Sequence, residues 1–283
     1  MDGRPPEAPT RHLNHVRHRG PLDQAGRFPD FLILGPQRTG TTWLYHNLRK
    51  HPEIFLPAMK ETFFFSTLGR PDHAHFRFPY LEDYLAVYRE PWKRRIKRNY
   101  DCLRSSFRLS HPKVYGEATA TYARLKESVI ADIVALNPDL RGVLMVRDPV
   151  ERAWSHAKKE IQKAGLAEDV AENYLTFIKR NDQSQCADYK TMAARWSRHL
   201  KPGRLYFADY RRITTDPLGL RRDICLFLGV SPDVMRKTRH LGERVNTTGG
   251  TSMPPEVKKY LESRFAQERL EAEELIKQPQ ATY

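Results

Sequence analysis

The sequence predicts a single α/β domain built on a parallel β-sheet that is flanked by helices. Two short apolar runs, at 31–34 and 142–146, are each bounded by a loop and then followed by a segment with helical spacing. Short buried strands that alternate with helices are typical of a parallel sheet. A length of 283 residues is enough for one large domain with a full core.

The first strand, loop and helix are expected over residues 31–50. The run 31–34 is too short for a helix and is bounded at once by Gly35 and Pro36, and helical spacing from Thr41 stops at His51 and Pro52. Such a loop points backbone N–H groups and the positive end of the helix dipole at one place. The sequence therefore predicts an anion site here, of the kind that most often holds phosphate.

The spacing between Gly35 and Gly40 matches the nucleotide phosphate loop G-x-x-x-x-G-K-[ST], but its lysine is missing. Thr41 and Thr42 follow Gly40 directly, and the nearest cation is Arg38 within the loop. We therefore predict a P-loop-like nucleotide-binding core without the lysine of nucleotide triphosphatases.

Other segments of the chain continue the alternation of strands and helices. We predict further strands at 53–57, 114–117 and 204–207, and helices at 79–89, 125–136, 150–163, 168–180, 187–200, 217–228 and 255–276. The stretch 91–112 is basic and irregular, and we interpret it as a candidate substrate-facing excursion. Its run 93–98 is either a patch for an acidic substrate or a solvated basic surface.

Residues 1–27 lack an apolar core and are rich in Pro, Arg and His, which predicts a disordered basic N-terminal tail before a domain at 28–283. No signal peptide is evident and no run approaches the ~18 apolar residues of a membrane span, so we expect a cytoplasmic protein with no membrane partner. Three widely spaced cysteines argue against a disulfide framework and a zinc site, and we expect no metal.

The chain carries 48 basic and 34 acidic residues, a net charge of +14 that indicates anionic partners. We find no zinc finger, no RNA-binding sheet motif and no basic helix with regular aromatic residues, so no nucleic-acid partner is expected. The sequence gives no indication of the oligomeric state.

Two motifs resemble one known family. The pattern P-x-[KR]-[ST]-G-T-T at 36–42 resembles the 5'-phosphosulfate loop of sulfotransferases that use 3'-phosphoadenosine 5'-phosphosulfate (PAPS), above all the glycosaminoglycan-type and bacterial members. The string VRDPVERAWSHAKKE at 146–160 resembles their 3'-phosphate segment. The resemblance covers about residues 29–276. It implies that 28–283 is a sulfotransferase domain, with PAPS as donor and adenosine 3',5'-bisphosphate (PAP) as product.

The resemblance also implies residue roles. Glu61 of KETFFF would be the base that takes the acceptor proton, while Arg38 and Lys60 stabilise charge on the sulfuryl and leaving oxygens. Most relatives have lysine in place of Arg38, and arginine stabilises charge but does not donate a proton. The alternative for Lys60 and Glu61 is a surface salt bridge. The residues expected to hold the cofactor are Gln37, Arg38, Thr39, Gly40, Thr41, Thr42, Trp43, Arg147, Ser155, Thr247, Thr248, Gly249 and Gly250.

Some of these assignments leave alternatives open. Arg147 and Ser155 would bind the 3'-phosphate, but Arg147 can instead pair with Asp148 or Glu151. Trp43 either stacks on adenine or packs in the core. The small-residue loop 246–252 is expected to close over the 3'-phosphate.

The expected function is transfer of a sulfuryl group from PAPS to a hydroxyl or amine of a small metabolite or glycoside. The basic middle stretch favours an anionic glycan, whereas the lack of a membrane anchor favours a metabolite. One alternative is a P-loop-type nucleotide kinase, against which the missing lysine and the lack of a clear Walker-B acid count. Another is a non-enzymatic protein that binds anions or nucleic acid through its positive charge.

Overall fold

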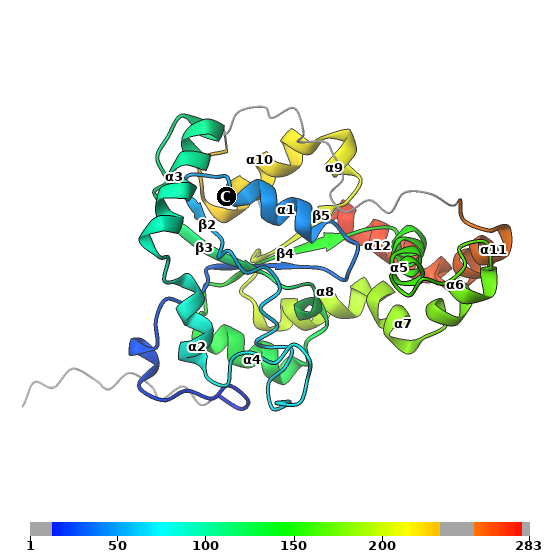
Figure 1. The fold of residues 1–283 in the computed structure, drawn as a ribbon, viewed down its shortest axis with the longest axis horizontal. Helices are drawn as coiled ribbons and strands as arrows, with labels where there is room; N and C mark the ends of the chain where they lie inside the picture. The colour runs from blue at the N-terminus through cyan, green and yellow to red at the C-terminus, as the bar shows by residue number, and fades with distance from the viewer. Residues whose placement is uncertain (1–12, 233–251, 279–283) are drawn as a thin grey trace, which may run out of the picture.

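The computed structural model describes residues 13–232 and 252–278, and in this part of the chain five parallel strands form one sheet (Figure 1). Their order across the sheet is β2-β3-β1-β4-β5. In the register, Leu32 of the central strand lies between Glu117 on one side and Gly142 on the other. The strands are β1 (Phe31–Leu34), β2 (Ile54–Phe55), β3 (Val114–Ala118), β4 (Arg141–Val146) and β5 (Leu205–Asp209).

Helices cover both faces of this sheet, with α1, α9 and α10 on one face and α2, α4 and α8 on the other (Figure 1). The predicted flanked parallel sheet is therefore confirmed. The α-helices are α1 (Thr41–Leu48), α2 (Leu81–Leu85), α3 (Trp92–Ser106), α4 (Glu127–Leu136), α5 (Pro149–Lys163), α6 (Ala171–Ile178), α7 (Asn181–Ala187), α8 (Tyr189–His199), α9 (Arg212–Thr215), α10 (Pro217–Leu228), α11 (Pro255–Arg264) and α12 (Ala266–Lys277).

The central strand β1 supplies both apolar cores because its side chains alternate between the two faces. Phe31 and Ile33 pack with the helices α1 and α10, whereas Leu32 and Leu34 pack with α4 and α8. All four are fully buried. A continuous apolar run is what a strand covered on both faces requires, which is why the sequence alone identified it.

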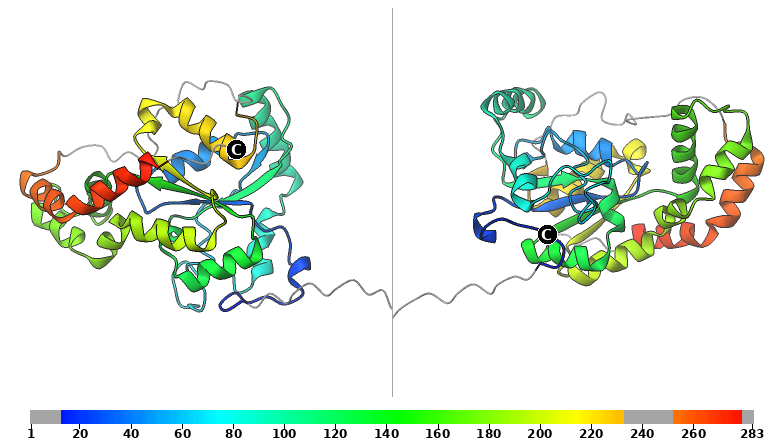
Figure 2. Two further views of the ribbon diagram at one scale, coloured as in Figure 1. Left: turned by 180° about the vertical axis from the view of Figure 1, so that it is seen from behind. Right: turned by 60° about the horizontal axis from the view of Figure 1, so that its bottom comes forward.

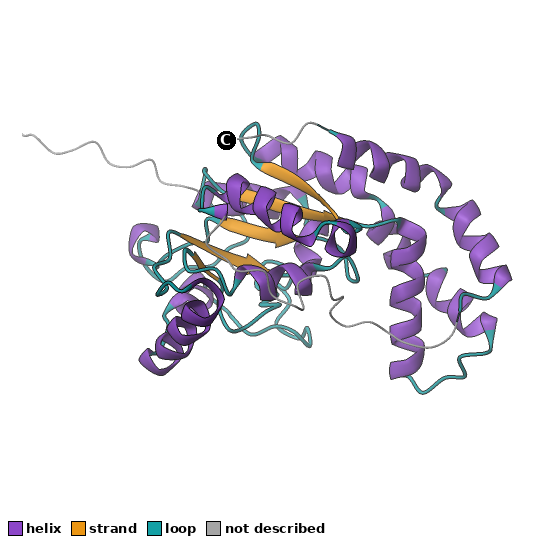
Figure 3. Ribbon diagram, turned by 90° about the horizontal axis from the view of Figure 1, so that it is seen from above, coloured by secondary structure: helices purple, strands orange, loops and turns teal. Residues whose placement is uncertain are grey.

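The helices α5, α6, α7 and α11 lie together as a lobe beyond the ends of β4 and β5, and α12 runs from this lobe back to the sheet, where it packs against β5 and α8 (Figures 2 and 3). A third apolar cluster holds α5, α6 and α11 together, and it includes Ala153, Tyr174 and Leu261. Because this cluster anchors α5, the lobe holds α5 beside the carboxyl ends of the strands, which is where ligands bind in open parallel sheets.

The prediction of a disordered tail over residues 1–27 is wrong for residues 13–27, because these residues pack against the domain. Val16 and Ala25 are buried in the core. The Asp132 carboxylate in α4 accepts hydrogen bonds from the backbone N–H groups of Asn14, at 2.9 Å, and His15, at 2.7 Å. Such backbone contacts to a distant side chain leave no periodic signal in the sequence. Residues 1–12 lie outside the described part.

Several element predictions also need correction. The stretch 91–112 is not irregular, because α3 occupies Trp92–Ser106, and the predicted helix at 255–276 is divided into α11 and α12 at Phe265. The short helices α7 and α9 were not predicted. Among the described residues, no helix has both the length and the apolar character needed to cross a bilayer.

Candidate active site

The predicted anion loop forms between β1 and α1. Gly40 is the residue before α1 and has a φ of 90°, and Gly35 has a φ of 146°. A Cβ at Gly35 would lie 2.6 Å from Thr39 Oγ1, so the tight turn requires glycine. Thr39 is buried, and its hydroxyl donates a 2.8 Å hydrogen bond to the carbonyl oxygen of Pro36. The loop is thus held by its own side chains, and the start of α1 is open toward a ligand.

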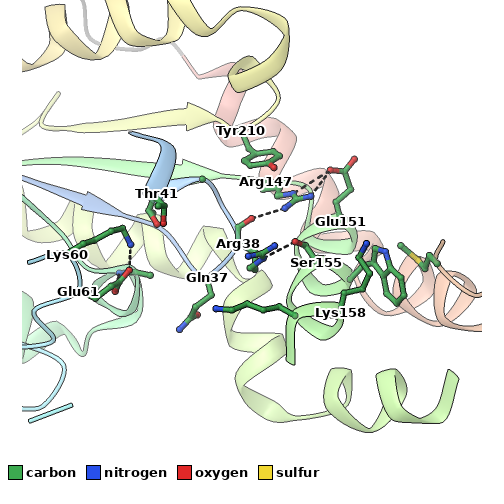
Figure 4. Close-up of a pocket in the computed structure, with 16 residues that line it drawn as sticks. Gln37, Arg38, Thr41, Lys60, Glu61, Arg147, Glu151, Ser155, Lys158 and Tyr210 are labelled. Carbon is green, nitrogen blue, oxygen red and sulfur yellow. Dashed lines mark hydrogen bonds and ion pairs between the residues drawn. The ribbon is translucent and has the colours of Figure 1, made fainter. Parts of the chain in front are cut away.

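A cavity of about 440 Å³ lies in front of this loop (Figure 4). Of its lining side chains, five are cationic (Arg38, Lys60, Arg147, Lys158 and Lys159) and two are carboxylates (Glu61 and Glu151). The other lining residues are Gln37, Gly40, Thr41, Thr42, Ala120, Trp154, Ser155, Tyr210 and Met253. This excess of positive charge next to a helix N-terminus suits a ligand with several anionic groups.

Arg38 connects the loop to helix α5. It has a φ of 74°, and its Nε donates a 2.9 Å hydrogen bond to Ser155 Oγ. Burial, together with the neighbouring charge of Arg147, lowers the pKa of Arg38. A non-glycine residue in this backbone conformation is costly and is often found at functional sites.

Arg147 follows β4, at the strand end where the sequence placed it, and it lies beside Arg38 (Figure 4). Its Nη1 donates a 2.9 Å hydrogen bond to the carbonyl oxygen of Arg38, and its guanidinium carbon lies 4.2 Å from the centre of the Tyr210 ring. Its Nη2 is 3.5 Å from Glu151 Oε2.

The two acidic neighbours of Arg147 differ in their contacts. The Asp148 carboxylate accepts a hydrogen bond from the backbone N–H of Glu151 at 3.0 Å and pairs with Arg269 of α12 at 2.7 Å. Of the two alternative partners of Arg147, only Glu151 is therefore positioned to contact it.

Lys60 and Glu61 line the opposite side of the cavity (Figure 4). The ammonium of Lys60 pairs with Glu61 Oε1, while Glu61 Oε2 accepts a 2.9 Å hydrogen bond from the N–H of Ala120. The N–H of Glu61 donates a 2.9 Å hydrogen bond to the carbonyl oxygen of Ala118 at the end of β3. The ion pair named as the alternative is present, but it faces the cavity. Glu61 also has a positive φ, of 60°.

Behind Glu61 lies a buried carboxylate to which the sequence analysis gave no role. Glu117 of β3 is fully buried and accepts hydrogen bonds from the hydroxyls of Thr62, Tyr84 and Thr119, the last at 2.6 Å. Thr119 Oγ1 accepts in turn from the N–H of Thr62 at 3.1 Å. Burial raises the pKa of Glu117, although the hydroxyl donors act in the opposite direction.

This network ties the segment that carries Glu61 to β3. The sequence contained one indication of this network. Glu117 is a carboxylate inside a predicted strand, and the hydroxyl residues of ATATY follow it directly. A buried charge needs such partners.

Some predicted cofactor residues do not reach the cavity. Trp43 is buried in the core formed by α1 and α10 and does not line the cavity, which favours the packing interpretation over stacking on adenine. Thr39 is also buried and contributes to the shape of the loop. Thr247, Thr248, Gly249 and Gly250 lie outside the described residues.

The cavity also contains residues that we did not predict, among them Lys158 and Lys159. They are three and four residues after Ser155 on α5, a spacing that places them on the same helix face. This periodicity was the signal that could have found them.

Comparisons with known proteins agree with the observed fold and with the family resemblance. The model of a family described as the sulfotransferase family matches residues 29–233. Heparan sulfate glucosamine 3-O-sulfotransferase 3B1 of Mus musculus is 27% identical over 213 residues, which cover 72% of this chain and 47% of that protein. Bifunctional heparan sulfate N-deacetylase/N-sulfotransferase 2 of Homo sapiens is 27% identical over 222 residues, which cover 73% of this chain and 22% of that protein. The chain thus spans about half the length, or less, of these curated relatives.

Among solved structures, a sulfotransferase from Alicyclobacillus acidocaldarius shares the fold with a TM-score of 0.60 and 23% sequence identity. The similarity covers 88% of this chain and 96% of that one. The family model covers all five strands of the described sheet, together with the phosphate loop, the Lys60–Glu61 pair and helix α5. The chain therefore belongs to the sulfotransferase family.

Proposed function

We propose that this chain is a PAPS-dependent sulfotransferase that transfers a sulfuryl group to a hydroxyl or amine of a small metabolite or glycoside. One observation carries the proposal. Segments far apart in the sequence, the phosphate loop, the Lys60–Glu61 pair and the start of α5, line one cavity. Family membership supports sulfuryl transfer as the reaction.

The residues present fit an anionic nucleotide donor. The loop backbone and the N-terminus of α1 would hold the 5'-phosphosulfate with Thr41 and Thr42, while Arg147 and Ser155 would hold the 3'-phosphate. The excess of cationic over acidic side chains in the cavity supports this assignment. When bound, PAPS supplies the activated sulfuryl group.

The chain's own residues would then perform acid–base and electrostatic work. A carboxylate oxygen of Glu61 would take the proton from the acceptor hydroxyl or amine as that atom bonds to the sulfur, with PAP as the leaving group. Arg38 and Lys60 hold the negative charge that grows on the transferred and leaving oxygens. Positioning and charge stabilisation dominate such transfers, as they do in phosphoryl transfer.

For the acceptor, we favour a small metabolite or glycoside, as the sequence analysis predicted. The names of two relatives, which refer to heparan sulfate, favour an anionic glycan as a second candidate. A cytoplasmic location and the absence of a nucleic-acid partner stay predictions from the sequence.

Thermal unfolding in the presence of nucleotides tests the proposal against the kinase alternative. A ligand that binds only the folded state stabilises it by about 2.7 kcal/mol at 100 times its Kd. We expect PAP to raise the melting temperature by roughly 5–10 °C and ATP to raise it far less. A mass-shift screen with PAPS and panels of phenols, sugars and anionic glycans then identifies the acceptor. Stronger protection by ATP, with phosphate transfer from it, would support the kinase instead.

A further inference from the structure

Helix α3 has an exposed apolar stripe. Trp92, Ile96, Tyr100 and Leu103 are 63%, 59%, 56% and 46% exposed, and Leu109, just beyond the helix, is 64% exposed. The spacings of four, four and three residues place the first four on one side of the helix. Large apolar side chains grouped in this way on a surface mark an interaction site.

The opposite side of α3 attaches to the domain. Cys102 is fully buried, and Arg98 forms an ion pair with Glu90 at 2.8 Å while its guanidinium carbon lies 5.4 Å from the centre of the Phe55 ring. Because Arg98 and Cys102 face the domain, the apolar stripe faces away from it. The helix stands at the β2 edge of the sheet, away from the helical lobe that borders the cavity (Figures 1 and 2).

Exposed cations accompany the stripe. The α3 sequence WKRRIKRNYDCLRSS contains six basic residues and one acidic residue, Asp101. Lys93 and Lys97 are three residues before Ile96 and Tyr100, a spacing that makes them neighbours of the stripe on the helix surface. The Nζ of Lys93 is 5.6 Å from the centre of the Trp92 ring. Long basic side chains can keep their charges in a polar layer while their stems lie along apolar surface. This combination defines a basic amphipathic helix.

We propose that α3 docks this protein on the surface of an anionic lipid bilayer. The stripe would enter the boundary between headgroups and acyl chains, and the flanking lysines and arginines would contact anionic headgroups. A nucleic acid or anionic polysaccharide would use the cations but has no matching surface for Ile96, Leu103 and Leu109. A second copy of the chain would bring two strongly basic helices together, which their like charges oppose.

This docking does not depend on the proposed transfer reaction. It also replaces the expectation of no membrane partner, which considered only spanning segments. With α3 at the far side of the sheet, the cavity stays accessible while the helix is docked.

Vesicle sedimentation with the full 283-residue chain tests the docking. Saturating PAP is added so that the cationic cavity is occupied and does not bind lipid itself. Vesicles of phosphatidylcholine with about one third phosphatidylglycerol are compared with pure phosphatidylcholine vesicles. We expect the partition coefficient to be roughly tenfold or more higher on the anionic vesicles.

Two variants with matched controls identify the surface. Trp92→Ser with Ile96→Ser and Leu103→Ser should lower partitioning roughly tenfold or more, whereas Leu166→Ser with Val170→Ser and Leu270→Ser, exposed apolar residues elsewhere, should leave it unchanged. Lys93→Gln with Lys97→Gln should lower it by roughly 10- to 30-fold, and Lys259→Gln with Lys277→Gln should have much less effect. Because all these side chains are exposed, melting temperatures should stay close to wild type.

Three results would overturn the proposal. The first is failure of the wild-type chain to bind anionic vesicles. The second is equal loss in the stripe variant and its control, or retention of binding in both, which would assign vesicle binding to the general positive charge. The third is a wild-type dimer in light scattering that the stripe substitutions dissociate while vesicle binding is absent, which would assign the stripe to a second copy.

Discussion

Arg147 Nη1 donates a 2.9 Å hydrogen bond to the backbone carbonyl oxygen of Arg38. The bond joins the loop after β4 to the loop after β1, the two loops for which the family resemblance implies binding of phosphate groups. Because Arg38 has a φ of 74°, this contact also helps to hold a costly backbone conformation. Arg147 therefore occupies a position from which it can bind ligand and shape the first loop.

Replacement of Arg147 separates a PAPS site from a general phosphate loop. Arg147→Ala removes charged hydrogen bonds worth ~1.5–3 kcal/mol, so affinity for PAP should fall roughly 10- to 150-fold. Affinity for adenosine 5'-monophosphate, which lacks the 3'-phosphate, should fall much less. Calorimetric titration of both nucleotides measures the contrast.

Glu151→Gln is the matched control because it removes the nearby carboxylate and keeps Arg147. It should maintain or increase affinity for PAP. Equal losses for both nucleotides in Arg147→Ala would show that Arg147 only supports the loop.

Glu117 should make the stability of the protein depend on pH. Burial raises the pKa of Glu117 above the ordinary 4.5. The stability that the protonated carboxyl group contributes to the folded protein is therefore fully present below pH 4.5 and is lost as the pH rises through the raised pKa. Glu117→Gln removes this titration. The free energy of unfolding of wild type relative to the variant should therefore decrease as the pH rises above 4.5 in urea titrations. A constant difference would mean that the carboxyl group titrates alike in the folded and unfolded chain.

His156 should make the folded protein less stable as the pH falls, which is the opposite of the effect of Glu117. Burial on α5, and then the neighbouring charge of Arg152, lower its pKa from 6.5 to about 4. The neutral imidazole therefore contributes stability above pH 6.5 that is lost as the pH falls through about 4, on the order of 3 kcal/mol. Wild type should lose this amount relative to His156→Gln between about pH 7 and about pH 4. Parallel losses in the two proteins would contradict the lowered pKa.

The sequence predicted the parts of the fold in which burial and periodicity agree. Phe31 to Leu34 and Val143 to Val146 are apolar because both faces of their strands are covered, and this makes such strands easy to recognise. Helix α3 was missed because its apolar residues are exposed and lie between many cations, so no buried face marked it as helical. Contacts between segments that are distant in the sequence, such as those of residues 13–27 with α4, were not predictable from local patterns.

Where a motif marked them, the sequence predicted residues that the structure brings to one cavity, namely Arg38, Glu61 and Arg147. Glu117 was not assigned because its partners come from separate segments and only the fold brings them together. Trp43 illustrates the reverse case. It follows the loop directly, yet the first turn of α1 directs its ring into the core.

Sulfuryl transfer by wild type and Glu61→Gln, with PAPS and an acceptor found in the screen, tests the proposed reaction most directly. Glutamine keeps the size of the side chain and its oxygen for the N–H of Ala120, but it does not accept the proton. We expect kcat to fall by roughly 10²–10⁴ while the Kd for PAP barely changes. A kcat near that of wild type, at unchanged affinity for PAP, would contradict Glu61 as the base.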